Sequence, residues 1–247
     1  MEMSFFRWFR NLFRRTPFNE INTNVIIGNK DTHLVSQKKL SEKETEKLIM
    51  LIEGCLYRAK SIVGTTTGER ANRTLKVRLF SRKSDYIKYG RKYITGFTDQ
   101  MDFCYWPSEQ TIFGYHMPER KLKPRLRHEC VHFLINCKLP LWIEEGVAEL
   151  SEGGVQVGHM RRAAYSGLTL PAQEIDREEL YKGKVWYAMG YALALYYYQQ
   201  GRLLHIISGD DKGGVNQDAF YDFILNSSMW RKKIGNTPYW SNDWNFR

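Results

Sequence analysis

The sequence predicts an α+β fold, with a small mixed sheet followed by a helix-rich C-terminal part. Short apolar or alternating segments, which are typical of strands, occupy residues 75–79, 101–106 and 110–116. Apolar side chains recur at helical spacing in residues 48–62 and 126–134, and a tyrosine-rich helical segment covers residues 185–200. The chain has 247 residues and is 43% hydrophobic, so it can bury the core of one enzyme-sized domain.

Residues 1–18 form a segment of distinct composition. In residues 4–15 the aromatic and leucine side chains fall on one arc of a helix, and the arginines fall on the other. Such a basic amphipathic helix is too short to span a bilayer and too interrupted by arginine for a signal peptide. We expect it to lie on an anionic membrane surface, or to dock on the body of this chain or on another subunit.

Residues 19–122 contain the predicted sheet. One or two strands are expected in residues 22–37, around a Gly-Asn-Lys-Asp turn. A long helix follows, and its start is indicated by Ser41 and Glu44, which have the spacing of a capping box. Residues 84–89 are expected to form a short helix between the later strands.

Residues 123–226 hold the candidate metal site, which begins in a helix that Pro124 is expected to open. His128 and His132 are four residues apart, so both imidazoles lie on one face of a helix and can bind one metal ion. Glu129 is placed to take a proton from a metal-bound water. The H-E-x-x-H pattern also occurs by chance in amphipathic core helices, so the context has to decide.

A second helix is expected to supply the third ligand. Residues 138–140 end the first helix, and the proline suits the first turn of the next one. Glu145 stands at the start of an apolar-periodic stretch that ends at residues 153–154, so its carboxylate can turn back toward the histidines. His159 is a further candidate, but Glu145 needs less rearrangement of the chain. Zinc with three protein ligands keeps a fourth position for water.

The two motifs resemble those of the gluzincin metallopeptidases. H-E-x-x-H at residues 128–132 is followed by W-I-E-E-G-V-A at residues 142–148, where the small bacterial peptidase-MA-like proteins have L-P-x-W-L-x-E-G-x-A-E. The resemblance covers residues 40–225 and implies a zincin-like metallopeptidase domain. It also implies that Glu145 is the third Zn²⁺ ligand, with Glu144 as the rival.

The same resemblance suggests partners for the ligand histidines. Aminopeptidases of this clan carry an acid seven residues after the ligand, and thermolysin-like enzymes carry one four residues after it. Glu152 and Glu149 occupy these positions here. Because a ligand histidine usually gives its other ring N–H to a carboxylate or carbonyl, we expect at least one of them to orient His128 or His132. The alternative is that both belong to a solvated helix face.

A tyrosine downstream is the candidate for stabilising the oxyanion. In related aminopeptidases the tyrosine of a Y-E-K-G-A motif donates a hydrogen bond to the oxyanion, and Tyr187 in V-W-Y-A-M-G matches it. Such a donor stabilises negative charge that develops only as water attacks the carbonyl. Tyr191 is the alternative, and most tyrosines of this segment are expected simply to pack the helix.

The resemblance also implies that an edge strand lines the cleft and pairs with an extended substrate. We assign residues 111–116 to this strand. His116 on it could face the cleft, but a lone histidine on a strand is more often structural, so we assign it no role. Residues 155–184 are mixed in character and suit a cleft wall or lid. A further helix is expected at residues 216–225.

The composition favours contact with anionic partners. The formal net charge is +10 and the pI is about 9.4, which favours phospholipid, nucleic acid or acidic protein. The four cysteines lack paired metal-type spacing and are expected to be reduced thiols in a cytoplasmic protein, which residues 4–15 could bring to a membrane. The basic, aromatic tail at residues 227–247 is expected to pack on the body, with stacking on bases or on a partner as the alternative.

Residues 19–247 are therefore predicted to form a zinc-dependent peptidase that acts on a peptide or protein substrate. Endopeptidase action is favoured, because residues 113–119 match poorly the G-x-M-E-N motif that binds the substrate's α-amine in aminopeptidases. The alternative is a non-catalytic zincin-fold scaffold at an anionic membrane or nucleic-acid surface. A nucleic-acid-associated protease similar to the SprT-like enzymes is not favoured, because these add cysteine-rich zinc modules or a histidine ligand.

Overall fold

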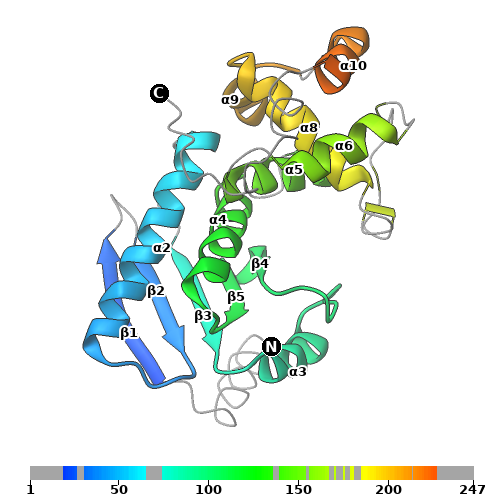
Figure 1. The fold of residues 1–247 in the computed structure, drawn as a ribbon. Coiled ribbons are helices and arrows are strands. Elements are labelled where there is room, and N and C mark those ends of the chain that lie inside the picture. The colour runs from blue at the N-terminus through cyan, green and yellow to red at the C-terminus, as the bar shows by residue number, and fades with distance from the viewer. Residues whose placement is uncertain are drawn as a thin grey trace, which may run out of the picture. The chain divides into compact units, whose positions relative to one another are not determined.

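The computed structural model describes residues 19–26, 31–64, 74–135, 139–153, 156–166, 185–212 and 214–226, with positions 170, 175, 179 and 180. The chain forms two compact units, which Figure 1 shows in one ribbon. Unit 1 comprises Met1–Gly54 and Thr67–Leu122, and unit 2 comprises Cys55–Thr66 and Lys123–Arg247. The predicted α+β class is confirmed, since the described strands belong to unit 1 and the described elements of unit 2 are helices.

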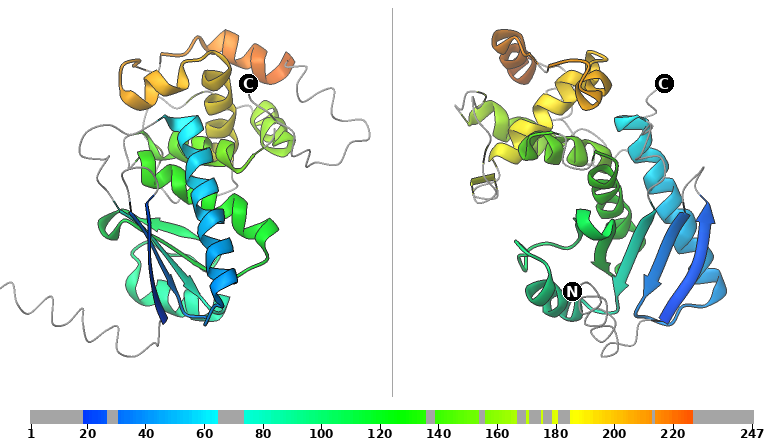
Figure 2. Two further views of the ribbon diagram at one scale, coloured as in Figure 1. Left: turned by 90° about the vertical axis from the view of Figure 1, so that its left-hand side faces the viewer. Right: turned by 180° about the vertical axis from the view of Figure 1, so that it is seen from behind.

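Unit 1 is built on a five-stranded sheet with the order β1-β2-β3-β5-β4 (Figure 2). The strands are β1 (Asn19–Ile26), β2 (Asp31–Ser36), β3 (Leu75–Phe80), β4 (Cys104–Trp106) and β5 (Thr111–Tyr115). The β1–β2 and β4–β5 pairs are antiparallel, whereas β2–β3 and β3–β5 are parallel. The sheet is therefore mixed, as the sequence predicts.

The prediction that residues 111–116 form the edge strand is wrong. β5 lies between β3 and β4, and β4 ends the sheet on that side. The reason is local, because the short 3₁₀ turn Pro107–Glu109 folds β4 back as the antiparallel partner of β5. His116 follows β5, and its Nε2 lies 2.8 Å from the hydroxyl of Ser36.

The long helix α2 (Glu42–Val63) starts with the predicted capping box. The backbone N–H of Ser41 donates to Glu44 Oε2 at 2.9 Å, and the backbone N–H of Glu44 donates to Ser41 Oγ at 3.3 Å. These two bonds satisfy donors that a helix start would otherwise leave without partners. The half of α2 that belongs to unit 1 lies along one face of the sheet (Figures 1 and 2).

Aromatic side chains pack α3 (Lys83–Tyr93) against β3 and β5. The centre of this cluster consists of Phe80, Tyr86 and Phe113. α3 extends beyond the predicted residues 84–89, because Tyr89 and Tyr93 continue the aromatic face, with ring centroids 4.8 Å apart. The ring of Phe97 rests on Gly90, where a Cβ atom would meet it at 2.4 Å. Because Gly90 has no side chain, the ring of Phe97 can pack into the cluster.

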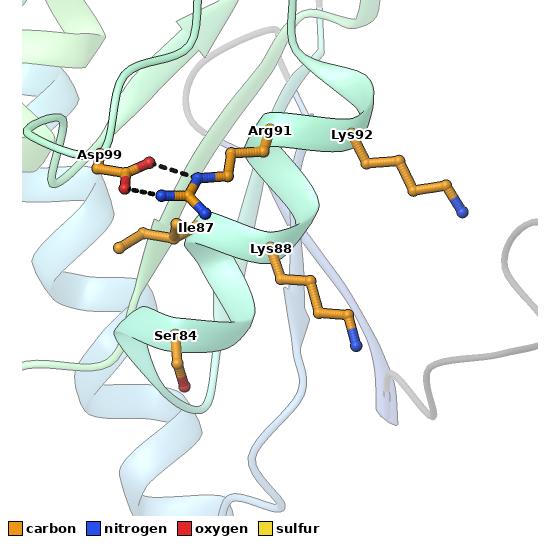
Figure 3. A pocket seen from close by; sticks show the side chains of 6 residues that line it. All are labelled: Ser84, Ile87, Lys88, Arg91, Lys92 and Asp99. Atoms are coloured by element: carbon orange, nitrogen blue, oxygen red, sulfur yellow. Dashed lines mark hydrogen bonds and ion pairs between the residues drawn. The ribbon is translucent and has the colours of Figure 1, made fainter.

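A shallow hollow lies on the exposed side of α3 (Figure 3). It is lined by Ser84, Ile87, Lys88, Arg91, Lys92 and Asp99. Arg91 Nε donates to Asp99 Oδ1 at 2.8 Å, so this guanidinium is already engaged by a carboxylate. These residues are not among those that the sequence assigns to the metal site.

The described part of unit 2 is helical. Its elements are the part of α2 from Cys55 onward, the part of α4 (Glu119–Ile135) from Lys123 onward, α5 (Leu141–Glu152), α6 (Val157–Tyr165), α8 (Val185–Gln199), α9 (Leu203–Ser208) and α10 (Gln217–Asn226). α10 agrees with the helix predicted at residues 216–225, whereas α6 and α9 were not predicted.

Pro124 does not open α4, which corrects another prediction. The helix begins at Glu119, and the backbone N–H of Leu122 donates to the carbonyl of Pro118 at 3.0 Å. Pro118 sets the start, because a proline disfavours helical geometry in the residue before it. Pro124 therefore lies inside the helix, where it cannot donate a backbone hydrogen bond.

Helices α5 and α8 cross in backbone contact. A Cβ atom on Gly146 would lie 2.1 Å from the carbonyl carbon of Gly190, and one on Gly190 would lie 1.9 Å from the carbonyl oxygen of Trp142. Beside the crossing, the rings of Trp142 and Trp186 meet edge to face with centroids 6.4 Å apart. The two glycines thus fix how closely α8 approaches the helix that carries Glu145.

Several predictions concern residues outside the described ranges. They are the amphipathic segment at residues 4–15, the tail at residues 227–247, and Cys137. The other cysteines, Cys55, Cys104 and Cys130, form no disulfide with one another. In the described part of the chain, no helix combines the length and the apolar character needed to cross a bilayer.

The crossing of α5 and α8 predicts that Gly190→Ala is destabilising. We expect the free energy of unfolding to fall by about 1–3 kcal/mol, because the new methyl group meets backbone rather than a movable side chain. Urea unfolding measures the change. Gly54→Ala is the matched control: Gly54 is an exposed helical glycine whose added Cβ would have no neighbour within 4 Å, so stability should rise by about 0.5–1 kcal/mol. Wild-type stability in Gly190→Ala would contradict the close crossing.

Candidate metal centre

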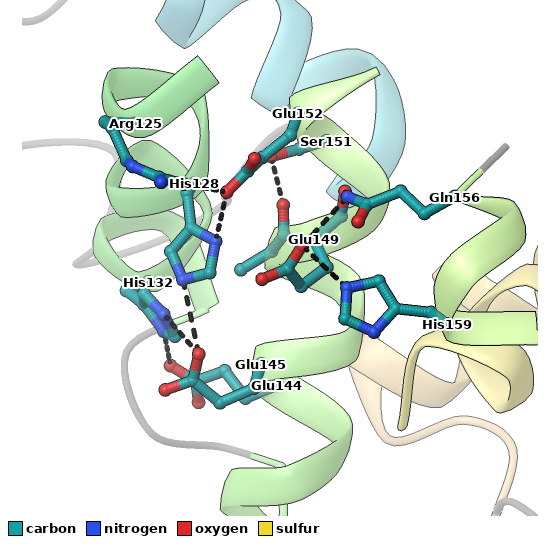
Figure 4. A network of polar contacts seen from close by, with 11 residues as sticks. Arg125, His128, His132, Glu144, Glu145, Glu149, Ser151, Glu152, Gln156 and His159 are labelled. Atoms are coloured by element: carbon teal, nitrogen blue, oxygen red, sulfur yellow. Dashed lines mark hydrogen bonds and ion pairs between the residues drawn. The ribbon is translucent and has the colours of Figure 1, made fainter. Parts of the chain in front are cut away.

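The candidate centre lies between α4 and α5 within unit 2 (Figure 4). His128 and His132 project from successive turns of α4, with ring centroids 5.1 Å apart. Glu145 of α5 places Oε2 3.2 Å from Nε2 of His128 and 3.7 Å from Nε2 of His132. Donor atoms at about 2.1 Å from one tetrahedral zinc ion lie about 3.4 Å apart. The three predicted ligands are therefore brought together with a spacing that fits one metal ion.

The other nitrogen of each imidazole contacts a second carboxylate of α5. His128 Nδ1 lies 3.0 Å from Glu152 Oε1, and His132 Nδ1 lies 2.7 Å from Glu144 Oε1. When Nδ1 carries the proton, each N–H has a carboxylate acceptor and each Nε2 faces Glu145. A neutral imidazole in this tautomer offers its Nε2 lone pair to a metal, which is how ligand histidines are commonly held.

The buried carboxylates of the site favour a positive charge beside them. Burial alone would disfavour charged imidazoles, but hydrogen bonds to Glu145 and Glu152 outweigh it and keep the pKa of His128 well above its usual value. For His132 burial is likewise outweighed, by attraction to Glu145 and a hydrogen bond with Glu144, which raise its pKa to about 10. Protons on the imidazoles thus balance the carboxylates, and a divalent ion at the same place would supply equivalent positive charge.

Glu129 is buried next to the first ligand. Glu129 is 7% exposed. Its negative charge raises the pKa of His128 further, beyond the effect of the hydrogen bonds to Glu145 and Glu152. A buried carboxylate adjacent to a metal ligand has the chemistry of a general base toward a metal-bound water. The role of Glu129 as general base stays a prediction from the sequence.

The two acids predicted to orient the histidines differ in what they contact. Glu152 holds His128, as expected for at least one of them. Glu149 instead accepts a hydrogen bond from Gln156 Nε2 at 2.8 Å and lies 3.5 Å from Nε2 of His159. These partners were not expected, because α6, which carries Gln156 at its start and His159 in its first turn, was not predicted.

The two candidate tyrosines also have different surroundings on α8. Tyr191 is fully buried, and its hydroxyl accepts a hydrogen bond from the backbone N–H of Gln156 at 2.9 Å. Its ring lies against the ring of His159, with centroids 5.4 Å apart. Tyr187 is half-buried one turn earlier, on the turn that precedes Gly190. The hydroxyl of Tyr191 therefore has a structural bond. Tyr187 stays the candidate oxyanion donor because of its match to the aminopeptidase motif.

Sequence reasoning missed the role of Glu144. It treated Glu144 and Glu145 as rivals for one ligand position, whereas both reach His132, at different nitrogens. The adjacent pair of acids was the available signal, because two consecutive helical side chains diverge by about 100° and can flank one ring.

Comparison with known proteins leaves the family open. The chain matches no protein-family model, and a search of curated proteins gives no significant match.

The centre predicts that zinc stabilises the protein. Zn²⁺ added to metal-free protein should raise Tm, because an ion that binds only the folded state stabilises it by about 4 kcal/mol at a thousand times Kd. Differential scanning calorimetry with Zn²⁺ and with a chelator measures the shift. Glu145→Gln should abolish it, whereas Glu46→Gln, an exposed carboxylate of α2, should keep it. A wild-type Tm that ignores both Zn²⁺ and chelator would rule out the site.

Proposed function

We propose that the chain is a zinc-dependent peptidase of the gluzincin type, with a zincin-like fold similar to that of the small bacterial peptidase-MA-like proteins. The observation that carries the proposal is the convergence of His128, His132 and Glu145 on one point, with Glu129 buried beside them. Three protein ligands of this kind suit a zinc ion that keeps a position for water.

The chain's own residues account for the chemistry. Zinc, when bound, polarises a peptide carbonyl and lowers the pKa of a bound water to about 7. Glu129 accepts the proton of the attacking water and later delivers it to the leaving amine. Tyr187 donates a hydrogen bond to the oxygen that becomes negative during attack. His128 keeps its orientation through Glu152.

The architecture of unit 1 supports the same proposal. A mixed sheet precedes the helix with the two histidines, as the resemblance implies. Residues 113–119 match poorly the motif that binds the substrate's α-amine in aminopeptidases, and we therefore propose an endopeptidase.

The proposal predicts that Glu129→Gln keeps zinc but loses turnover by orders of magnitude, because an amide cannot take the proton of water. Cleavage of casein and of a peptide library by purified protein, together with zinc analysis, measures both properties. The chelator-treated wild type should be equally inactive and recover with Zn²⁺. Zinc-loaded wild type without cleavage would favour the scaffold alternative, and full activity of Glu129→Gln would refute the proposed base.

Substitution of the two tyrosines should separate their roles. Tyr187→Phe is expected to lower kcat by about two to three orders of magnitude while zinc content is retained. Tyr191→Phe removes the acceptor of a buried N–H, so it should lower the free energy of unfolding by about 1–3 kcal/mol. Steady-state kinetics and urea unfolding of both variants test this. If Tyr191→Phe instead loses kcat at wild-type stability, Tyr191 is the oxyanion donor.

A further inference from the structure

Two consecutive carboxylates of α5 reach the same imidazole. Glu145 Oε2 lies 3.7 Å from Nε2 of His132, and Glu144 Oε1 lies 2.7 Å from Nδ1. The nitrogen that His132 can share with His128 in binding one ion is Nε2, since both Nε2 atoms face Glu145. Glu144 therefore contacts the imidazole at the nitrogen that does not face the ion.

The carboxylate of Glu144 is held firmly. The residue is 3% exposed, so little water competes for its oxygens. It lies in the first turn of α5, where the free N–H groups of a helix start favour negative charge. Its own backbone N–H donates to the carbonyl of Pro140 at 3.0 Å, which anchors that turn. Backbone and environment thus both fix Glu144 against His132.

We infer that Glu144 is a positioning residue of the metal centre, which accepts the Nδ1 proton of His132 and so presents the Nε2 lone pair to the ion. The inference rests on the proposed function in taking the site to be a metal centre. Carboxylates in this position orient the ring and increase its donor strength, and their loss weakens metal binding by about 10–100-fold.

Glu152 provides an internal comparison. It contacts Nδ1 of His128 at 3.0 Å, and Arg125 Nη1 lies 3.4 Å from the same oxygen. Its side chain is 11% exposed, against 4% for Glu144. Because Glu144 makes the shorter contact from the more buried position, we expect its substitution to weaken zinc binding more than the same substitution of Glu152.

The test compares zinc binding by full-length wild type and by the variants Glu144→Gln, Glu152→Gln, Glu145→Gln and Glu46→Gln. Glutamine keeps the size of the side chain and can still accept a hydrogen bond, so Glu144→Gln probes the loss of charge. Metal analysis gives the zinc content, competition with a chromogenic chelator gives Kd, and the visible spectrum of the Co²⁺-loaded protein reports on the ligands. Circular dichroism checks the fold.

We expect Glu144→Gln to bind one Zn²⁺ with Kd raised about 10–100-fold, and its Co²⁺ bands to shift while keeping the intensity of the wild type. Glu145→Gln should lose zinc at the same protein concentration, and Glu46→Gln should match the wild type. If Glu144→Gln fails to fold, Glu144→Asp, which keeps the charge but cannot span the contact, should show the same rise in Kd.

Two results would overturn the inference. Wild-type Kd in the folded Glu144→Gln variant would show that the carboxylate does not act on His132. Loss of zinc from Glu144→Gln, with retention by Glu145→Gln, would make Glu144 the ligand instead. Zinc-loaded wild type that cleaves no peptide would refute the proposed peptidase and leave the role of Glu144 intact, so the two proposals fail separately.

Discussion

The contact between the imidazoles of α4 and the carboxylates of α5 is the interaction on which unit 2 is organised. Glu144 and Glu145 are each no more than 5% exposed. A buried carboxylate is costly unless a positive charge or strong donors accompany it. His128 and His132 meet this need when they are protonated, and a metal ion meets it with the imidazoles neutral. The buried carboxylates of unit 2 thus require a positive charge beside them, from protonated imidazoles or from a metal ion.

Helical periodicity explains why α5 suffices for this arrangement. Glu145 and Glu152 are seven residues apart, so they lie on one face two turns from each other. His128 and His132 lie one turn apart on α4, and Glu145 contacts both while Glu152 contacts the first. Glu144 leaves the helix about 100° away from Glu145, which brings it to the opposite nitrogen of His132. One helix can therefore supply a ligand and both supporting carboxylates.

The sequence predicted the parts of the structure that depend on local spacing. The α+β class, the capping box at Ser41 and the pairing of His128 with His132 follow from periodicity and motif spacing, and the choice of Glu145 as their partner came with the family resemblance. The edge position of β4 depends on which strand folds back after a turn. The partners of Glu149 depend on α6, a short helix that was not predicted and that carries Gln156 at its start and His159 in its first turn. Such features are determined by tertiary packing, which cannot be predicted from the spacing of apolar residues along the chain.

The glycine contact between α5 and α8 changes how the metal motif itself is understood. Gly146 directly follows Glu145, and it is needed because the backbone of α8 occupies the space of a side chain. In this chain, the glycine of the W-x-x-E-G motif is thus explained by the close packing of α8 and not by a role in the chemistry of the site. A designer who grafts the histidine helix and the glutamate helix onto another scaffold would have to transplant α8 as well, or refill the space that it leaves.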